Sequence, residues 1–513
     1  MSHEHSLYKL KENLVPFMAH PVSSSLIWCA PDVEDSQAMQ HACSYVIDST
    51  CSAPGKTFFA ERYGGSGIQR NGGGARCGFD GCYQVKGIGA NPLVGQGTDG
   101  RHSNGALGAI HAVYEALWGE VLSRLLPYGA VRARAVLLTD LYTSEAWDRT
   151  DGASRRALLV RDPVVRPAHF ERAPYFRPQP EFASRLLHDA RRVSAVIQKL
   201  PDYLPGPEQG ARDAGRVSQQ QRCLEGLCEL ARREAWQMAY CRTRYLRLTT
   251  SPSNLAMDGR LMDFNGLSSL FPGDYPDDFG YRLRITELEK EPAVLLQGLC
   301  DLCLYLGKYL FDTGFTEQAQ RQVTEVFRTT FEEACYHGYL EQLGIPLTGA
   351  VVPPPLKQLV HGFLMLSARL RKPGCSEKGD SPLQHAAVAL IRGLRNETAA
   401  PREHWHREGY YQEALQCFSG GIHWLHQAGK VRESNTASFL QSMEQQVRCR
   451  LQPRDSMAKA RLFAEITCLI DEYGDSPEYL QQAFSDMGTR MLTWAKEALG
   501  TLPSARYCSQ LVG

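Results

Sequence analysis

Two side chains that could hold a metal ion lie in the segment SPSNLAMDGRLMDFNG, residues 251–266. Asn254 and Asp263 both carry hard oxygen ligands, the type that Mg²⁺ prefers when water and phosphate complete its shell. A turn at Asp258-Gly259 would place both side chains at one end of a hairpin. A polar hairpin without a metal fits the segment equally well in isolation, so the choice depends on what the rest of the chain offers.

Upstream of this segment the chain contains a glycine cluster that ends in Arg76. Its members are Gly64, Gly65, Gly67, Gly72, Gly73 and Gly74. Glycines let backbone amides approach an anion without an intervening Cβ, and an arginine adds a charged fork. The cluster could therefore hold phosphates, although a flexible loop explains such a pattern more often when it stands alone.

A lysine and a glutamate follow the glycine cluster. Lys86, in YQVKGIG, comes after an alternating apolar stretch and is therefore expected on a strand. A lysine held inward can neutralise phosphate if a carboxylate fixes its position. The predicted helix that contains YEALWGE supplies Glu115 and Glu120. The alternative is an exposed lysine with two solvated glutamates, which is what these residue types usually are.

Arginines complete the set of residues that could bind a nucleotide. Asp99, Gly100 and Arg101 form a turn, and Arg161 and Arg166 lie in LLVRDPVVRPAHFE. Guanidinium forks match triphosphate oxygens, whereas surface salt bridges are the common alternative and contribute little. A glycine loop, a strand lysine, a helix glutamate, an Asn and then Asp-Phe follow one another as in a protein-kinase-like nucleotide site. The shared order favours the functional interpretation of each part.

The elements that must position these residues can be outlined from the pattern. Residues 60–108 predict short strands and turns, residues 107–126 one long helix, and residues 133–142 and 155–165 two strands. Helices are expected at 182–200, 216–243, 283–313, 316–342, 355–371, 382–395, 408–428, 434–449, 456–473 and 476–499. We expect three regions, namely an N-lobe at 1–150, a C-lobe at 151–345 and a helical C-terminal region at 346–513.

Composition limits the class of protein. The chain has 513 residues, too many for one compact core, and a formal net charge of zero, which argues against a nucleic-acid partner. No run approaches the ~18 apolar residues that span a bilayer, and the polar N-terminus has no signal-peptide core, so we expect no membrane span and a cytoplasmic location. The 16 cysteines are therefore expected as thiols. Cys77 and Cys82 lie close together, but no second pair has zinc-like spacing.

The ordered motifs resemble the selenoprotein-O family of kinase-fold proteins, pseudokinases that transfer AMP rather than phosphate. The resemblance covers roughly residues 60–275. The family's K-G-x-G and D-G-R motifs are matched by residues 86–89 and 99–101, and its helix motif E-x-L-x-x-E by residues 115–120. Its segment R-x-A-P…R-F-G-x-F-E is matched loosely by Arg161, Arg166 and HFE at 169–171. Its metal segment, D-N-x-x-x-x-G-x-x-x-D-[YF]-G, is matched by Asn254, Asp263 and Phe264.

The resemblance implies an α+β, protein-kinase-like bilobal fold. A glycine-rich β-containing N-lobe would precede a large, mostly helical C-lobe with a helical C-terminal extension, and ATP would bind in a flipped orientation. Lys86, Glu115 and Asp263 would be the catalytic group, with Glu115 positioning Lys86. Asn254 and Asp263 would hold Mg²⁺. The nucleotide would contact Gly73, Gly74, Arg76, Lys86, Asp99, Gly100, Arg101, Arg161 and Arg166.

Three departures from the family pattern bear on the reaction. Ser253 stands where the family has the Asp that is its presumed base, Asn265 displaces the glycine after Asp-Phe, and the chain ends in RYCSQLVG without a cysteine–selenocysteine tail. A serine is no general base at neutral pH. An acceptor carboxylate needs no deprotonation at pH 7, and its adenylation would give an acyl-AMP that acylates an alcohol or amine.

The whole chain is also similar to the large subunit of siderophore-microcin maturation complexes. That resemblance implies adenylyl transfer from ATP to the C-terminal carboxylate of a microcin precursor peptide. Ester linkage to a glucosylated catecholate siderophore would follow, with a small acyltransferase-like partner subunit. Two alternatives stay open. One is a protein AMP-transferase acting on Ser, Thr or Tyr, for which Asp258 is the nearest base, and the other is a non-catalytic ATP-binding scaffold.

Overall fold

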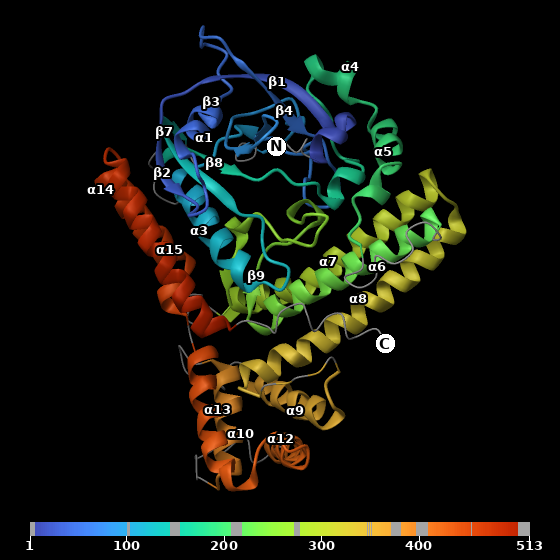
Figure 1. The fold of residues 1–513 in the computed structure, drawn as a ribbon, viewed down its shortest axis with the longest axis vertical. Coiled ribbons are helices and arrows are strands. Elements are labelled where there is room, and N and C mark those ends of the chain that lie inside the picture. Colours follow the sequence, from blue (N-terminus) through green and yellow to red (C-terminus); the bar gives the residue numbers. More distant parts are fainter. Residues whose placement is uncertain are drawn as a thin grey trace.

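The chain combines an antiparallel sheet in its N-terminal region with a mostly helical C-terminal region (Figure 1). The computed structural model describes residues 6–99, 103–143, 154–206, 218–270, 278–345, 347, 349, 351–370, 381–396, 409–452 and 454–500. The α+β class expected from the sequence is confirmed at this level. The boundary expected near residue 150 lies outside the described residues.

Eight strands form the main sheet, in the order β2-β7-β8-β6-β5-β4-β1-β3. They are β1 (Leu14–Pro21), β2 (Ser24–Cys29), β3 (Tyr45–Val46), β4 (Lys56–Glu61), β5 (Cys77–Phe79), β6 (Gln84–Lys86), β7 (Ala133–Thr143) and β8 (Ser154–Arg161). In the described residues, all neighbouring strands of this sheet pair antiparallel. A second, two-stranded sheet pairs β9 (Leu246–Arg247) with β10 (Ser268–Ser269).

The middle of β7 is buried on both faces of the sheet, since successive side chains of a strand point to opposite faces and the consecutive residues there are all buried. Val136 and Leu138 of β7 join the core that contains α3 (Ala109–Leu125). Ala135 and Leu137 alternate with them and join a second core with Met39 of α1 (Ser36–Cys43). The predicted strands at 133–142 and 155–165 are thus confirmed as β7 and β8, with small differences at their ends.

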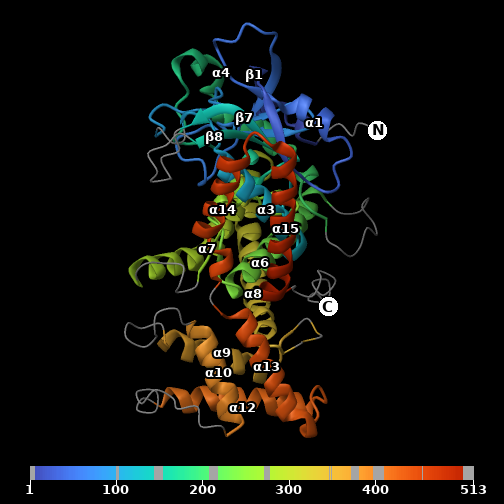
Figure 2. The ribbon, with the colours of Figure 1, turned by 90° about the vertical axis from the view of Figure 1, so that its left-hand side faces the viewer.

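Of the remaining helices, α4 lies beside the sheet, and α6 to α13 lie in the middle and at the far end of the molecule (Figure 2). The remaining helices are α4 (Ala183–Leu186), α5 (Asp189–Ile197), α6 (Gln219–Thr243), α7 (Asp278–Tyr309), α8 (Thr313–Gln342), α9 (Pro354–Leu370), α10 (Pro382–Leu394), α12 (Tyr410–Gln427), α13 (Thr436–Arg450), α14 (Lys459–Tyr473) and α15 (Pro477–Leu499). The prediction of one helix at 182–200 is wrong. The backbone leaves helical geometry at His188, with φ −90° and ψ 57°, and α5 starts after it.

The last two helices return to the N-terminal region. Helices α9, α10, α12 and α13 share an apolar core with the end of α8, whereas α14 and α15 belong to the large core around α3. Helix α15 packs on α3 and β2, and α14 packs on α3, as both views show (Figures 1 and 2). Among the described residues no helix has the length and apolar character that crossing a membrane requires.

Candidate functional site

A cavity of about 430 Å³ lies where the glycine-rich segment, β6, β8 and the 251–266 hairpin meet. Nine of the sequence-predicted site residues line it, namely Gly73, Gly74, Arg76, Lys86, Asp99, Arg161, Arg166, Asn254 and Asp263. Gly100 and Arg101 lie outside the described residues. Glu115 is not among the lining residues but contacts Lys86 from behind. Residues that are far apart in the sequence are thus gathered around one space.

Lys86 is the most deeply buried charged residue that lines the cavity. It lies on β6 between β5 and β8, and its side chain is 1% exposed. Its Nζ donates to Glu115 Oε2 at 2.6 Å and to Asp263 Oδ1 at 2.7 Å. A buried ammonium is tolerated only when it is paired and hydrogen-bonded, and two carboxylates supply that pairing here. The strand lysine and the helix glutamate predicted from the sequence therefore meet.

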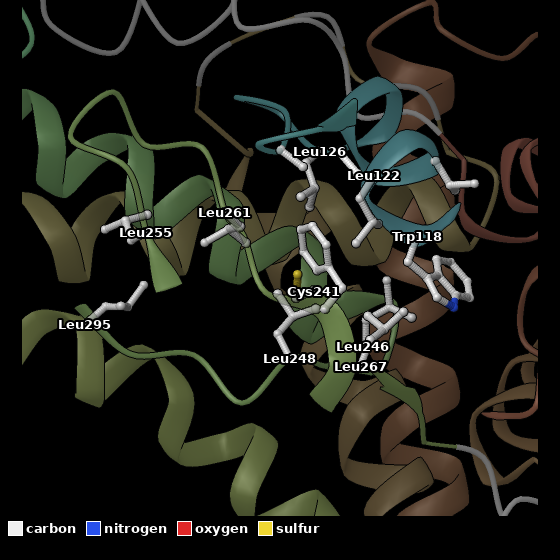
Figure 3. Close-up of a cluster of buried hydrophobic side chains, with 14 of the residues drawn as sticks. Trp118, Leu122, Leu126, Cys241, Leu246, Leu248, Leu255, Leu261, Leu267 and Leu295 are labelled. Atoms are coloured by element: carbon white, nitrogen blue, oxygen red, sulfur yellow. The ribbon is translucent and has the colours of Figure 1, made fainter. Parts of the chain in front are cut away.

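The 251–266 segment forms the expected hairpin. Leu255 and Leu261 make an antiparallel bridge, and Met262 N donates to Asn254 O at 3.0 Å. This pairing brings Asn254 and Asp263 to the open end of the hairpin, at the cavity. The back of the hairpin is anchored in the large core, where Leu255, Leu261 and Leu267 lie with Trp118 and Leu122 of α3 (Figure 3).

The backbone conformation and the carboxyl pKa of Asp263 are both unusual. Its φ of 66° and ψ of 69° are left-handed, which for a non-glycine residue costs roughly 1–3 kcal/mol and is concentrated at functional sites. Burial raises the pKa of its carboxyl, but Lys86, Arg161 and Arg76 outweigh burial, so the pKa lies well below its usual value. Asp263 is therefore ionised at every pH at which the protein would function.

The oxygen atoms at the hairpin's open end fit a divalent cation. Asn254 Nδ2 donates to Thr249 O at 3.3 Å, so its amide oxygen is the atom that is left to act as a ligand. Asp263, which lines the same cavity, presents an ionised carboxylate. One carboxylate, one amide oxygen and phosphate oxygens make a suitable Mg²⁺ shell. Across the described residues, no three or more His, Cys, Asp or Glu side chains cluster as a metal site would, and the proposed Mg²⁺ pair is smaller than such a cluster.

A buried network that no sequence motif indicates holds Arg161 of β8 and Arg166 of the following segment. Gln84 Oε1 accepts from Arg161 Nε and, at 3.4 Å, from Arg166 Nη2, while its Nε2 donates to Glu61 Oε1. Glu61 also faces His169 Nε2 at 3.3 Å. Burial raises the pKa of Glu61, but His169 and Arg166 outweigh it and lower the pKa. Gln84 lies two residues before Lys86, so both side chains point to the same face of β6. That spacing is the one sequence signal that could have identified Gln84.

Arg166 connects the hairpin to the glycine-rich segment. Its Nη1 donates to Ser253 O at 2.6 Å, and its guanidinium lies 5.0 Å from the ring centre of Tyr63. Ser253 Oγ and Ser251 Oγ are 2.8 Å apart. The position that carries a carboxylate in the resembled family is thus occupied by the hydroxyl of Ser253, which is hydrogen-bonded to that of Ser251.

Two glycines of the cluster are required by close approach. Gly73 has a φ of 143°, and a Cβ there would lie 2.1 Å from Glu61 O. A Cβ on Gly67 would lie 2.4 Å from the hydroxyl oxygens of Ser251 and Ser253. The missing side chain at Gly73 therefore lets the segment lie against Glu61 of β4, and the missing side chain at Gly67 lets it reach the hairpin.

Asp258 lies away from this site. It is not among the residues that line the cavity, its side chain is 48% exposed, and its Oδ2 accepts from Arg260 Nε at 2.8 Å. An exposed aspartate paired within its own turn is expected to be structural.

No family model matches the chain, and no curated protein matches it either. The geometry of the cavity and the motifs that resemble the selenoprotein-O family are therefore the observations that point to a function.

Proposed function

We propose that this protein is an ATP- and Mg²⁺-dependent adenylyl transferase with a protein-kinase-like bilobal arrangement. One observation carries the proposal. Lys86 contacts both Glu115 and Asp263 at the wall of a cavity whose rim holds a glycine segment and several arginines. A strand lysine, a helix carboxylate and a metal-ligating aspartate are the parts that kinase-like sites use to hold phosphates.

The charges of the cavity favour a polyphosphate. Its lining includes five cationic side chains, Arg70, Arg76, Lys86, Arg161 and Arg166, against two acidic ones, Asp99 and Asp263. Such an excess of one sign attracts the opposite charge, and guanidinium groups can bind phosphate oxygens in pairs. The cavity's volume of about 430 Å³ lies within the ~300–1,000 Å³ typical of small-molecule sites.

Asn254 and Asp263 would hold Mg²⁺, which would neutralise phosphate charge when bound. Lys86 lies 2.7 Å from Asp263 Oδ1 and would therefore contact the same phosphate group. Glu115 keeps Lys86 in place, because it contacts both Lys86 and, at 3.3 Å, Arg161 Nη1. These residues orient the phosphates, and none of them needs to take a proton.

The hydroxyl pair at Ser251 and Ser253 bears on which chemical group accepts AMP. A hydroxyl acceptor would need a base, and Ser253 cannot serve as one. A carboxylate is already a nucleophile at neutral pH. We therefore assign the acceptor as a carboxylate. Its oxygen attacks the α-phosphorus of ATP, pyrophosphate leaves, and the product is an acyl-AMP.

The resemblance to siderophore-microcin maturation subunits supports a specific acceptor and specific partners. The carboxylate would be the C-terminus of a microcin precursor peptide. A sugar hydroxyl of a glucosylated catecholate siderophore would then displace AMP, with the help of a small acyltransferase-like partner subunit. The ester bond forms between the peptide carbonyl and the sugar oxygen as the bond from that carbonyl to the AMP oxygen breaks.

A non-catalytic ATP-binding scaffold is the second candidate, and Ser253 also favours it. AMP transfer to a protein hydroxyl has less support, because Asp258, its nearest base, is not among the residues that line the cavity.

The nucleotide products distinguish these functions. The purified chain is incubated with Mg²⁺ and ATP, with and without a microcin C-terminal peptide and the partner subunit, and the products are identified by mass spectrometry. AMP and pyrophosphate that require the peptide support carboxylate adenylation. ADP would mean phosphoryl transfer, and bound ATP without turnover would favour the scaffold.

A further inference from the structure

The first residue of α14 contacts the loop that follows Asp263. Lys459 Nζ donates to the backbone oxygen of Asn265, 194 residues away in the sequence. The same ammonium lies 5.3 Å from the ring centre of Tyr114 and 5.0 Å from that of Phe463. A lysine at a helix N-terminus is unfavourable for the helix dipole, so its contacts with the loop and the rings must offset that cost.

A second link leads from the loop to the cavity. Asn265 Nδ2 donates to Glu115 Oε2, the same oxygen that accepts from Lys86 Nζ at 2.6 Å. The other oxygen of Glu115 accepts from Arg161 Nη1 at 3.3 Å. Lys459, Asn265, Glu115 and Lys86 therefore form one continuous chain of polar contacts from the C-terminal helices to the cavity wall.

Apolar contacts hold α3 against the same two helices. His111 and Tyr114 of α3 each meet Phe463 of α14 edge to face, with ring centres 5.0 Å apart. On α15, a Cβ at Gly488 would lie 3.3 Å from Leu117 Cδ2, so the helices approach closely there. Figure 2 shows α3 between α14 and α15. The helix that carries Glu115 is thus supported at His111, Tyr114 and Leu117 by α14 and α15.

We infer that α14 and α15 are a built-in positioning element for the nucleotide site, and that Lys459 acts through Asn265 to hold Glu115 against Lys86. This inference depends on the proposed function for its nucleotide readout. Lys459 is a positioning residue, because it does not line the cavity. A glycine at position 265, as in the resembled motif, could not form the link to Glu115. The asparagine that stands in place of this glycine therefore makes the contact between α14 and Glu115 possible.

The substitution Lys459→Met tests the link, because it keeps the apolar stem against the two rings and removes the donor. Lys496→Met on α15 is the matched control, since Lys496 is exposed. We expect Mg·ATP affinity to fall about tenfold in Lys459→Met, ~1.4 kcal/mol, as one hydrogen bond that orders a charged group is lost. Lys459→Arg, which keeps a donor, should stay within about threefold of the wild type, and so should the control.

Combined substitutions show whether Lys459 acts through Asn265. If it does, Asn265→Ala should weaken Mg·ATP binding by a similar factor, and adding Lys459→Met should cause little further loss. Independent, multiplying losses would overturn the inference. Asn265→Ala alone still decides the case if Lys459→Met does not fold, because unchanged affinity in that variant contradicts the link.

Hydrogen exchange without nucleotide separates this inference from the proposed function. Lys459→Met should speed amide exchange in residues 109–125 and 263–267, and Lys496→Met should not. If the wild type binds no Mg·ATP, the proposed function fails, while local exchange still decides the positioning role. Unchanged exchange in both segments would overturn the inference, whatever the nucleotide result.

Discussion

Lys86→Met should weaken Mg·ATP binding more than any other single substitution on the sheet. Lys86 is 1% exposed, so a phosphate oxygen that reaches it meets a charge with little competing water. A hydrogen bond to a charged group contributes about 1.5–3 kcal/mol, which corresponds to a loss of roughly 10- to 150-fold in affinity. The assay is isothermal titration calorimetry with Mg·ATP.

The same substitution also has a cost in stability. Removing one partner of a buried ion pair typically costs about 3–5 kcal/mol. The low end applies here, because Glu115 keeps Arg161 and Asn265 as partners and the Asp263 side chain is 25% exposed. Affinity must therefore be measured at a temperature at which circular dichroism shows the variant folded.

Lys56→Met is the matched control for Lys86→Met. Lys56 is also a strand lysine paired with a carboxylate, since its Nζ lies 2.8 Å from Asp80 Oδ2, but it does not line the cavity. We expect its Mg·ATP affinity to remain within about twofold of the wild type. Equal affinity of the Lys86 variant and the wild type would refute the phosphate role of Lys86.

Asp263→Asn tests the metal assignment, with Asp258→Asn as its control, and Glu171→Gln tests the effect of burial on a carboxyl group. Asp263→Asn should reduce AMP formation by about 100-fold or more, because it removes the ionised metal ligand, while Asp258→Asn in the same hairpin should stay near wild type. Loss of activity in Asp258→Asn would instead favour transfer to a hydroxyl. Burial, with Asp301 adding to it, raises the pKa of Glu171 from 4.5 to about 8. The folded state thus keeps a proton that the unfolded chain loses, so this contribution to stability is present below pH 4.5 and is lost as the pH rises through 8. Glu171→Gln should therefore reduce the fall in urea midpoint between pH 5 and pH 8, and an unchanged fall would contradict the burial argument.

The sequence predicted which candidate residues lie around one cavity better than it predicted their surroundings. Lys86, Glu115 and Asp263 were identified because each belongs to a short motif with a known order of parts. Their contacts could not be predicted from spacing alone, since Lys86 and Asp263 are 177 residues apart and meet only through the sheet and the hairpin.

Gln84, Glu61 and Asn265 were not predicted to contact the site residues. Each is a polar residue without a motif, and its role depends on which partner the fold brings to it. Helix α3 was predicted from its periodicity, but periodicity does not say which face receives which partner, because α3 is buried on nearly every side. The return of α14 and α15 to α3 is a long-range packing event that no local pattern encodes.

The measurement that tests carboxylate adenylation most directly is the fate of an isotope in the acceptor. A microcin C-terminal peptide with ¹⁸O in its terminal carboxylate is incubated with the chain, the partner subunit, Mg²⁺, ATP and hydroxylamine as the trapping nucleophile. Attack of the carboxylate on the α-phosphorus predicts that the released AMP carries one ¹⁸O and that the peptide becomes a hydroxamate. Unlabelled AMP, or ADP with the label in inorganic phosphate, would contradict it.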